Sequence, residues 1–195
     1  DQELEGLDLS SWRIALNGAE AVRPETLARF TERYAPHGFD EGAHFPAYGL
    51  AEASLAVTFP PPGRGPLLET LSRERLEADG VVVTCGPDER PLTLVACGRP
   101  LPEMEVRVVS PQGVVLEEKL RGLVEFRGPS SLVGYFENEE ATEAVKDSDG
   151  WVKTGDLGFL SEGELYLTGR VKDVIIKAGR NIQAEDVEDM VASVE

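Results

Sequence analysis

The sequence contains no run of about 18 apolar residues, the length that a membrane-spanning helix requires. It also lacks the basic and apolar leader of a secreted protein, because it opens on the acidic stretch DQELEGLDL. We therefore expect no membrane span and no signal peptide. The first residue is not methionine, which suggests an excised piece of a longer protein.

Basic residues and cysteines are scarce. There are 19 Lys and Arg against 36 Asp and Glu, a net charge of −17, so we expect no nucleic acid partner. Any polyphosphate ligand then needs local cations or a metal ion. Cys85 and Cys97 fit no metal or redox spacing and are expected to be reduced, mostly buried thiols. That expectation favours a cytoplasmic location.

Several catalytic signatures are missing. The chain has no G-x-S-x-G, no G-x-x-x-x-G-K-[ST] and no G-x-G-x-x-G motif. The only histidines, His37 and His44, lie close together in a predicted loop. We expect them to be solvated or hydrogen-bonded, so serine-hydrolase chemistry is not indicated.

The pattern along the chain predicts a mixed α/β fold. Residues 12–19 read as a buried strand that ends in a glycine turn, and residues 23–36 read as a helix with Pro24 in its first turn. Residues 45–59 read as a strand, a glycine turn and another apolar segment. Residues 67–80 fit either a short helix or an extended surface arm.

The second half changes character. Short apolar runs between residues 81 and 135 predict strands of a small barrel or sandwich. A helix is expected at about 138–146, with Asn138 as its N-cap. An acidic helix is expected at 184–195.

Two segments before residue 60 could carry chemistry. In LNGAE, Gly18 would let the backbone approach a flat ligand, or would simply end a strand. In PAYGLAEASL, Tyr48 offers an aromatic face and Gly49 a close approach, while Glu52 is an acid in an apolar run. A carboxylate there either holds Mg²⁺ or is a paired, buried acid.

A third segment, residues 151–175, places Asp156 beside a glycine and Arg170 fourteen residues later. An Asp on a glycine turn can accept hydrogen bonds from a vicinal diol, and an Arg can neutralise a phosphate. The alternative is a purely structural ion pair between Asp156 and Arg170.

Taken in order, these segments resemble the adenylate-forming enzymes, which include acyl-CoA synthetases, luciferases and peptide-synthetase adenylation domains. Within that superfamily the chain looks most like the fatty acyl-AMP ligases. The resemblance is densest in RIALNGAEAVRPETLARFTERYAPHGF, FPAYGLAEASLAVTF, CGRPLPEMEVRVVSPQG, RGPSSLVGYFENEEAT and GWVKTGDLGFLSEGELYLTGRVKDVIIKAGRNIQAEDVE.

The resemblance implies a fold and a division of the chain. Residues 1–170 would be the C-terminal part of a large adenylation domain. That part would hold a strand–helix segment and a β-barrel-like subdomain at about 81–135. Residues 171–195 would be the hinge, centred on Lys172, and the start of a small C-terminal domain.

It also implies roles for individual residues toward ATP or AMP and Mg²⁺. The adenine pocket would be lined by Gly18, Ala19 and Glu20, with Tyr48 stacked on the base. Gly49 would lie near the acyl channel, and Ala51 stands where many relatives carry a threonine that contacts phosphate. Asp156 would bind the ribose hydroxyls, Arg170 the ribose and phosphate, and Glu52 the Mg²⁺.

The implied reaction joins a fatty acid and ATP into acyl-AMP and pyrophosphate, with an acyl carrier protein or polyketide synthase as acceptor. A long-chain acyl-CoA ligase is the alternative, although Ile176 stands where some CoA users carry Lys and Lys177 follows it. A non-catalytic nucleotide-binding or interaction module is an alternative of another class. The phosphate loop and catalytic lysine would lie outside residues 1–195, so the isolated chain is expected to be inactive.

Overall fold

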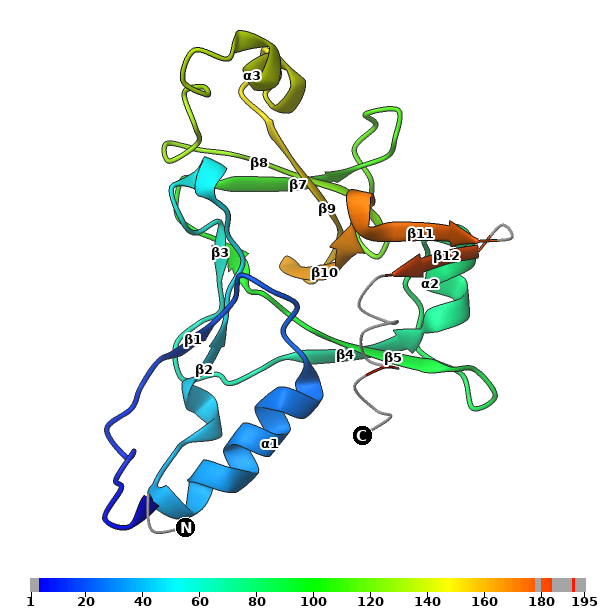
Figure 1. Cartoon of the computed structure of the whole chain (residues 1–195). Helices are drawn as coiled ribbons and strands as arrows, with labels where there is room; N and C mark the ends of the chain where they lie inside the picture. Colours follow the sequence, from blue (N-terminus) through cyan, green and yellow to red (C-terminus); the bar gives the residue numbers. More distant parts are fainter. Residues whose placement is uncertain (1–3, 178–179, 184–190, 192–195) are drawn as a thin grey trace.

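The computed structural model describes residues 4–177, 180–183 and 191 (Figure 1). Its helices are α1 (Pro24–Tyr34), α2 (Arg73–Asp79) and α3 (Glu139–Val145), with 3-10 turns η2 (Ala35–His37), η3 (Glu41–Ala43), η4 (Ala51–Ala53) and η5 (Val171–Asp173). Among the described residues, none of the helices has the length and apolar character needed to cross a membrane.

The first part of the chain forms a β-α-β unit. Strand β1 (Ala15–Asn17) pairs in parallel with β2 (His44–Pro46), and α1 makes the crossover between them. Parallel neighbours need such a crossover because a tight turn joins only antiparallel strands. The turns that leave β1 and β2 therefore lie at the same edge.

Local sequence explains where the helices begin. Pro24 stands at the start of α1, where its missing N–H costs nothing. The hydroxyl of Ser72 accepts a hydrogen bond from the Arg75 N–H at the start of α2. The side chain of Asn138 accepts one from the Ala141 N–H at 3.0 Å, which confirms it as the N-cap of α3.

The main sheet is antiparallel, in the order β10-β9-β8-β7. Its strands are β7 (Glu105–Val109), β8 (Gly122–Arg127), β9 (Val152–Ser161) and β10 (Glu164–Arg170). Two of these strands come from the 81–135 range and two from beyond it. Helices and strands together confirm the mixed α/β class. The described sheet is open, so this part of the fold is a sheet and not the barrel that was expected.

Shorter strand pairs flank this sheet. They are β3 (Thr58–Phe59) with β6 (Arg99–Pro100), β4 (Leu68–Ser72) with β5 (Pro91–Val95), and β11 (Val174–Lys177) with β12 (Arg180–Gln183). Residues 67–80, for which the sequence allowed either a short helix or an extended arm, contain both the strand β4 and the helix α2. In Figure 1, α3 lies at the end of the molecule away from α1.

The core consists of two hydrophobic clusters that share the β9–β10 hairpin. One includes Tyr48, Phe126 and Leu165, and the other includes Leu71, Phe159 and Tyr166. The rings of Phe159 and Tyr166 stack with centroids 5.0 Å apart. Because residues of β9 and β10 pack in both clusters, this packing fixes the position of the hairpin relative to the rest of the chain.

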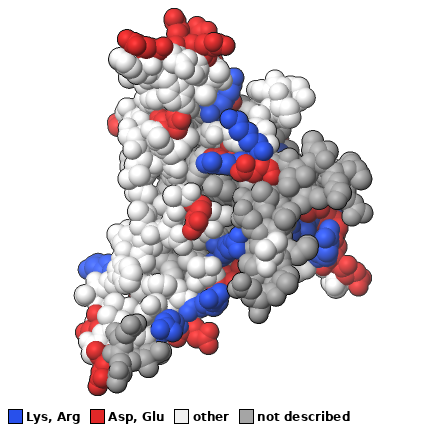
Figure 2. All heavy atoms as spheres, in the orientation of Figure 1, with Lys and Arg blue, Asp and Glu red and all other residues white. Residues whose placement is uncertain are grey.

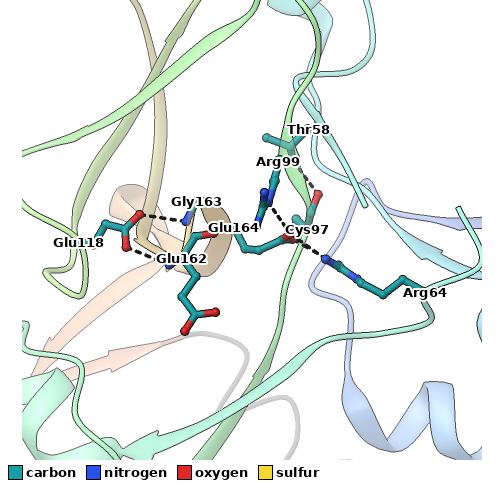
Figure 3. Close-up of polar contacts among 8 residues, drawn as sticks. All are labelled: Thr58, Arg64, Cys97, Arg99, Glu118, Glu162, Gly163 and Glu164. Atoms are coloured by element: carbon teal, nitrogen blue, oxygen red, sulfur yellow. Dashed lines mark hydrogen bonds and ion pairs between the residues drawn. The ribbon is translucent and has the colours of Figure 1, made fainter. Parts of the chain in front are cut away.

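The closed end of the β9–β10 hairpin is fixed by ionic contacts, as Figure 3 shows. Glu164 is 1% exposed and accepts hydrogen bonds from Arg64 at 2.7 and 3.2 Å and from Arg99 at 3.0 Å. The Glu118 carboxylate accepts from the N–H groups of Glu162 and Gly163, both at 2.9 Å. A buried carboxylate needs such partners, since burying it unpaired would be costly.

Some sequence expectations need correction. The strand predicted at 12–19 is only three residues long, and it is not buried, because Leu16 is 61% exposed. In the described chain, β1 pairs only with β2, so little covers its side chains. The acidic helix expected at 184–195 lies outside the described residues except for position 191.

Both cysteines are free, as expected. Cys97 is buried, and burial raises the pKa of its thiol to about 12, which makes it a poor nucleophile. Cys85 is only half-buried.

Candidate functional site

A cavity of about 1010 Å³ opens where several distant segments meet. It is lined by the turn after β1, the first turn of α1, the turn after β2, and residues of α2 and β5. The open ends of β9 and β10, with η5, complete the wall. This size matches pockets that bury small-molecule ligands, which occupy about 300–1,000 Å³.

Asp156 is the most constrained acid on this wall. The residue is 4% exposed, and its Oδ2 accepts a hydrogen bond from the Tyr48 hydroxyl at 2.6 Å. Arg170 Nε donates to Oδ1 at 2.8 Å. The ion pair that sequence analysis kept as an alternative is therefore present, and Tyr48 joins it. Each carboxylate oxygen can accept more than one hydrogen bond, so the pair does not exclude a ligand.

Hairpin register brings Asp156 and Arg170 together. They are directly paired residues of β9 and β10, and the register shifts between Leu167 and Gly169. Gly155 adopts a φ of +78°, which glycine tolerates and other residues disfavour. Gly155 lies inside β9, where the pairing with β8 shifts register, so the glycine turn expected beside Asp156 is an irregularity within a strand.

Tyr48 lines the cavity and also belongs to the core. It is 6% exposed and packs in the cluster with Phe126 and Leu165. Burial, and then the neighbouring Asp156 charge, raise the pKa of its phenol. The hydroxyl therefore remains a hydrogen-bond donor to Asp156 at neutral pH.

The turn after β1 contributes Ala19 and Glu20 to the lining. Ala19 has a φ of +70°, uncommon for a residue with a Cβ. Gly18 is not among the lining residues. A Cβ at Gly18 would lie 2.8 Å from the Ala47 carbonyl oxygen, so glycine is needed there for the turn to pack against the end of β2.

The turn after β2 holds Gly49 on the cavity wall. A Cβ at Gly49 would overlap the Leu55 carbonyl oxygen. Ala51 is exposed at the start of η4 and offers no hydroxyl.

Glu52 lies in η4, half-buried, and is not among the residues that line the cavity. Its carboxylate accepts a hydrogen bond from the Tyr135 hydroxyl at 2.6 Å. Among the described residues, no group of three or more His, Cys, Asp or Glu could hold a metal ion. A single hard carboxylate still fits Mg²⁺, which proteins commonly bind through one or two carboxylates together with substrate phosphates.

Lys172 is exposed in η5, immediately after Arg170 and Val171. The next residue, Asp173, lines the cavity. Ile176 and Lys177 belong to β11, and the structure describes only their backbone. The segment expected to be a hinge thus begins at the edge of the cavity.

Charge on the visible face is uneven (Figure 2). Acidic side chains gather at the end formed by α3, while Lys and Arg lie among acids over the middle of this face. Arg23, Arg73 and Arg121 line the cavity. The acids Glu20, Glu25, Glu77, Asp156 and Asp173 line the cavity as well. An anionic ligand would therefore meet these arginines among carboxylates, in a chain whose net charge is −17.

Sequence reasoning missed three contributors: Tyr135, α2 and β5. Tyr135 was noted only as part of a matching segment, although its hydroxyl contacts Glu52. The helix α2 and strand β5 were not expected near the ligand site, yet residues from both line the cavity. No local signal marks such contacts, since they arise from tertiary packing.

Comparison with known proteins agrees with this arrangement. Residues 1–136 match the family described as AMP-binding enzyme. A putative acyl-CoA synthetase of Caulobacter vibrioides is 43% identical over 188 residues, covering 96% of this chain and 33% of that protein. The medium-chain-fatty-acid–[acyl-carrier-protein] ligase JamA of Moorena producens is 41% identical, with coverage of 93% and 32%.

Solved structures give the same picture. One, from studies of fatty acyl-adenylate ligases of E. coli and L. pneumophila, has a TM-score of 0.93 at 39% identity, covering 99% of this chain and 35% of that chain. A second, a fatty acyl-adenylate ligase from L. pneumophila in complex with acyl adenylate and pyrophosphate, has a TM-score of 0.82 at 38% identity, covering 89% and 31%.

The chain spans about a third of the length of the curated relatives it matches. The family description nevertheless covers well over half of its residues. On sequence, fold and the convergence of Tyr48, Asp156 and Arg170 at one cavity, this chain belongs to the AMP-binding enzyme family.

Proposed function

We propose that the protein containing this chain activates a fatty acid with ATP, forming acyl-AMP and releasing pyrophosphate. The observation that carries the proposal is the Tyr48–Asp156–Arg170 cluster on the wall of a nucleotide-sized cavity. Relatives named for fatty acid–AMP and fatty acid–carrier-protein ligation support the same reaction.

In this proposal, Asp156 accepts hydrogen bonds from the ribose hydroxyls, for which an acidic residue is well suited. The carboxylate is already oriented by Tyr48 and Arg170, so it loses little freedom when the sugar binds. The Arg170 side chain is 64% exposed, which leaves its guanidinium accessible to the α-phosphate as well.

The adenine ring would lie between the turn of Gly18, Ala19 and Glu20 and the ring of Tyr48. Ala19, Glu20 and Tyr48 all line the cavity, which supports this placement. Gly18 supports it indirectly, by letting the turn approach β2. Gly49 would face the acyl end of the same ligand.

Glu52 would hold Mg²⁺ together with the ATP phosphates. The ion supplies positive charge where two anions, a carboxylate and a phosphate, must approach each other. Arg170 contributes to the same neutralisation. The absence of a threonine at Ala51 removes one further phosphate contact.

We also propose that residues 1–170 belong to the large domain and that residues 171–195 start a small C-terminal domain, with Lys172 as the pivot. The location of η5, directly after Arg170 and at the edge of the cavity, supports this division. Rotation at such a pivot would reorganise the site between steps. The phosphate loop and catalytic lysine would come from outside residues 1–195, so the isolated chain would be inactive.

The acyl acceptor would be an acyl carrier protein or a polyketide synthase, which the name of the relative JamA supports. The similarity to a putative acyl-CoA synthetase favours CoA as the second candidate acceptor. The free thiols of Cys85 and Cys97 favour a reducing compartment such as the cytoplasm.

Pyrophosphate release tests the proposal in the full-length protein. Release that depends on a fatty acid and proceeds without CoA or thioester formation is the expected result. Formation of acyl-CoA would favour the acyl-CoA ligase. No pyrophosphate release, with or without nucleotide binding, would instead indicate a non-catalytic module.

A further inference from the structure

Residues 130–135 cross over the η4 turn and bind to it at three points. The Leu132 N–H donates to the Glu52 carbonyl at 2.7 Å, and the Ser54 hydroxyl donates to the Ser130 carbonyl at 3.2 Å. The third contact differs in kind. The Tyr135 hydroxyl donates to Glu52 Oε1 at 2.6 Å, so it bonds the carboxylate itself.

Helix α3 holds this segment in place from the other side. The Tyr135 N–H donates to Thr142 Oγ1 at 2.9 Å, and Lys146 Nζ donates to the Leu132 carbonyl at 2.7 Å. The Tyr135 backbone is therefore fixed on α3, while its phenol reaches Glu52 over 83 residues of sequence. A tyrosine held in this way presents its hydroxyl at one defined place.

We propose that Tyr135 is a positioning residue whose hydroxyl orients the Glu52 carboxylate for the Mg²⁺ that accompanies ATP. The inference rests on the proposed function, in which Glu52 is the metal ligand. Metal-binding carboxylates are themselves commonly hydrogen-bonded, and losing such a partner costs about 10–100-fold in metal affinity or activity.

The geometry separates this role from that of a clamp, by which we mean contacts that only hold residues 130–135 on η4. With Oε1 bonded to Tyr135, Oε2 accepts no hydrogen bond from the described residues and remains available to a cation. The contacts through Leu132 and Ser54 would continue to hold residues 130–135 on η4 if the Tyr135 hydroxyl were removed. Loss of the hydroxyl should therefore affect the metal more than the fold.

The test uses Tyr135→Phe in the full-length protein. Binding of Mn²⁺, in the presence of a non-hydrolysable ATP analogue, is followed by the electron paramagnetic resonance signal of free Mn²⁺. We expect Mn²⁺ affinity to fall about 10-fold or more. The Mg²⁺ concentration for half-maximal activity should rise in parallel, with activity largely restored at saturating Mg²⁺.

Two control variants isolate the effect. Ser54→Ala breaks a clamp contact without touching the Glu52 carboxylate, and it should lower the melting temperature but leave Mn²⁺ affinity unchanged. Tyr34→Phe makes the same chemical change on α1, where the ring packs on Phe30 at 4.5 Å, and it should change neither property.

Glu52→Gln distinguishes the inference from the function on which it rests. It should weaken Mn²⁺ binding, and adding Tyr135→Phe to it should cause no further loss. If Glu52→Gln weakens binding but Tyr135→Phe binds like wild type, the positioning role is refuted and Glu52 keeps its role. If Glu52→Gln itself has no effect, both assignments fall.

Folding cannot obscure the outcome. The Mn²⁺ affinity is measured on the folded fraction isolated by gel filtration. The affinity of Tyr135→Phe and its melting temperature are then both compared with those of Ser54→Ala. A Tyr135→Phe protein that loses stability but no more Mn²⁺ affinity than Ser54→Ala would overturn the proposal, because it would show a clamp and nothing else.

Discussion

Replacing Asp156 by alanine should reduce both stability and adenylate formation, for reasons that the structure separates. In the folded protein the carboxylate accepts from the Tyr48 hydroxyl at 2.6 Å and from Arg170 Nε at 2.8 Å. After the substitution, the buried Tyr48 hydroxyl has lost its acceptor, which costs about 1–3 kcal/mol. The Arg170 side chain is 64% exposed, so loss of the ion pair adds less than about 1 kcal/mol.

The expected destabilisation is thus about 1–4 kcal/mol, most of it from the Tyr48 hydroxyl that has lost its acceptor. Differential scanning calorimetry of the full-length variants measures that change. Adding Tyr48→Phe to Asp156→Ala removes the orphaned hydroxyl and should recover part of the lost stability, although Tyr48→Phe alone should be destabilising.

Activity follows a different pattern from stability. Asp156→Ala should abolish most fatty-acid-dependent pyrophosphate release, and the double variant should remain inactive because the ribose acceptor is still missing. Wild-type turnover by Asp156→Ala would remove this residue from the site. Failure of Tyr48→Phe to recover any stability would refute the account of the buried hydroxyl.

Further predictions concern other parts of the chain. Burial lowers the pKa of His44 below 6.5, so the unfolded chain takes up the proton at a higher pH than the folded one. The stability that His44 contributes above pH 6.5 should be lost as the pH falls through its lowered pKa, and urea titrations should show a smaller loss in His44→Gln. Gly49→Ala should cost about 1–3 kcal/mol, since its Cβ overlaps the Leu55 carbonyl. A Cβ at Gly86 would have the flexible Glu89 side chain as its nearest neighbour, so Gly86→Ala should be nearly neutral, and a destabilisation equal to that of Gly49→Ala would contradict the steric argument. Glu164→Gln should cost about 1.5–3 kcal/mol by weakening the bonds to Arg64 and Arg99. Glu105→Gln removes the charge from the exposed ion pair between Glu105 and Arg127, and it should change the melting temperature little.

Short-range features were accessible from sequence. The helix starts at Pro24 and Asn138 depend on chemistry within one turn, and both are confirmed. The glycine beside Asp156 indicated a turn, but Gly155 lies inside β9, and its positive φ falls where the pairing with β8 shifts register. By contrast, burial of residues 12–19 was predicted wrongly, because burial depends on what packs against a strand and not on its composition alone.

Contacts across the chain were not accessible in the same way. A spacing of fourteen residues does not reveal that Asp156 and Arg170 are directly opposed, because a bulge at Leu167–Gly169 sets that register. The Tyr48 hydroxyl reaches Asp156 across 108 residues, and Tyr135 reaches Glu52 across 83.

The sequence by itself determined which residue types are present for the chemistry, where the helices start and which family the chain resembles. Only the tertiary structure decided that one cavity gathers the turns after β1 and β2 with the open end of the β9–β10 hairpin. The physical reason is that local propensity acts over a few residues. The placement of distant segments is instead fixed by the packing of two shared cores and by strand register.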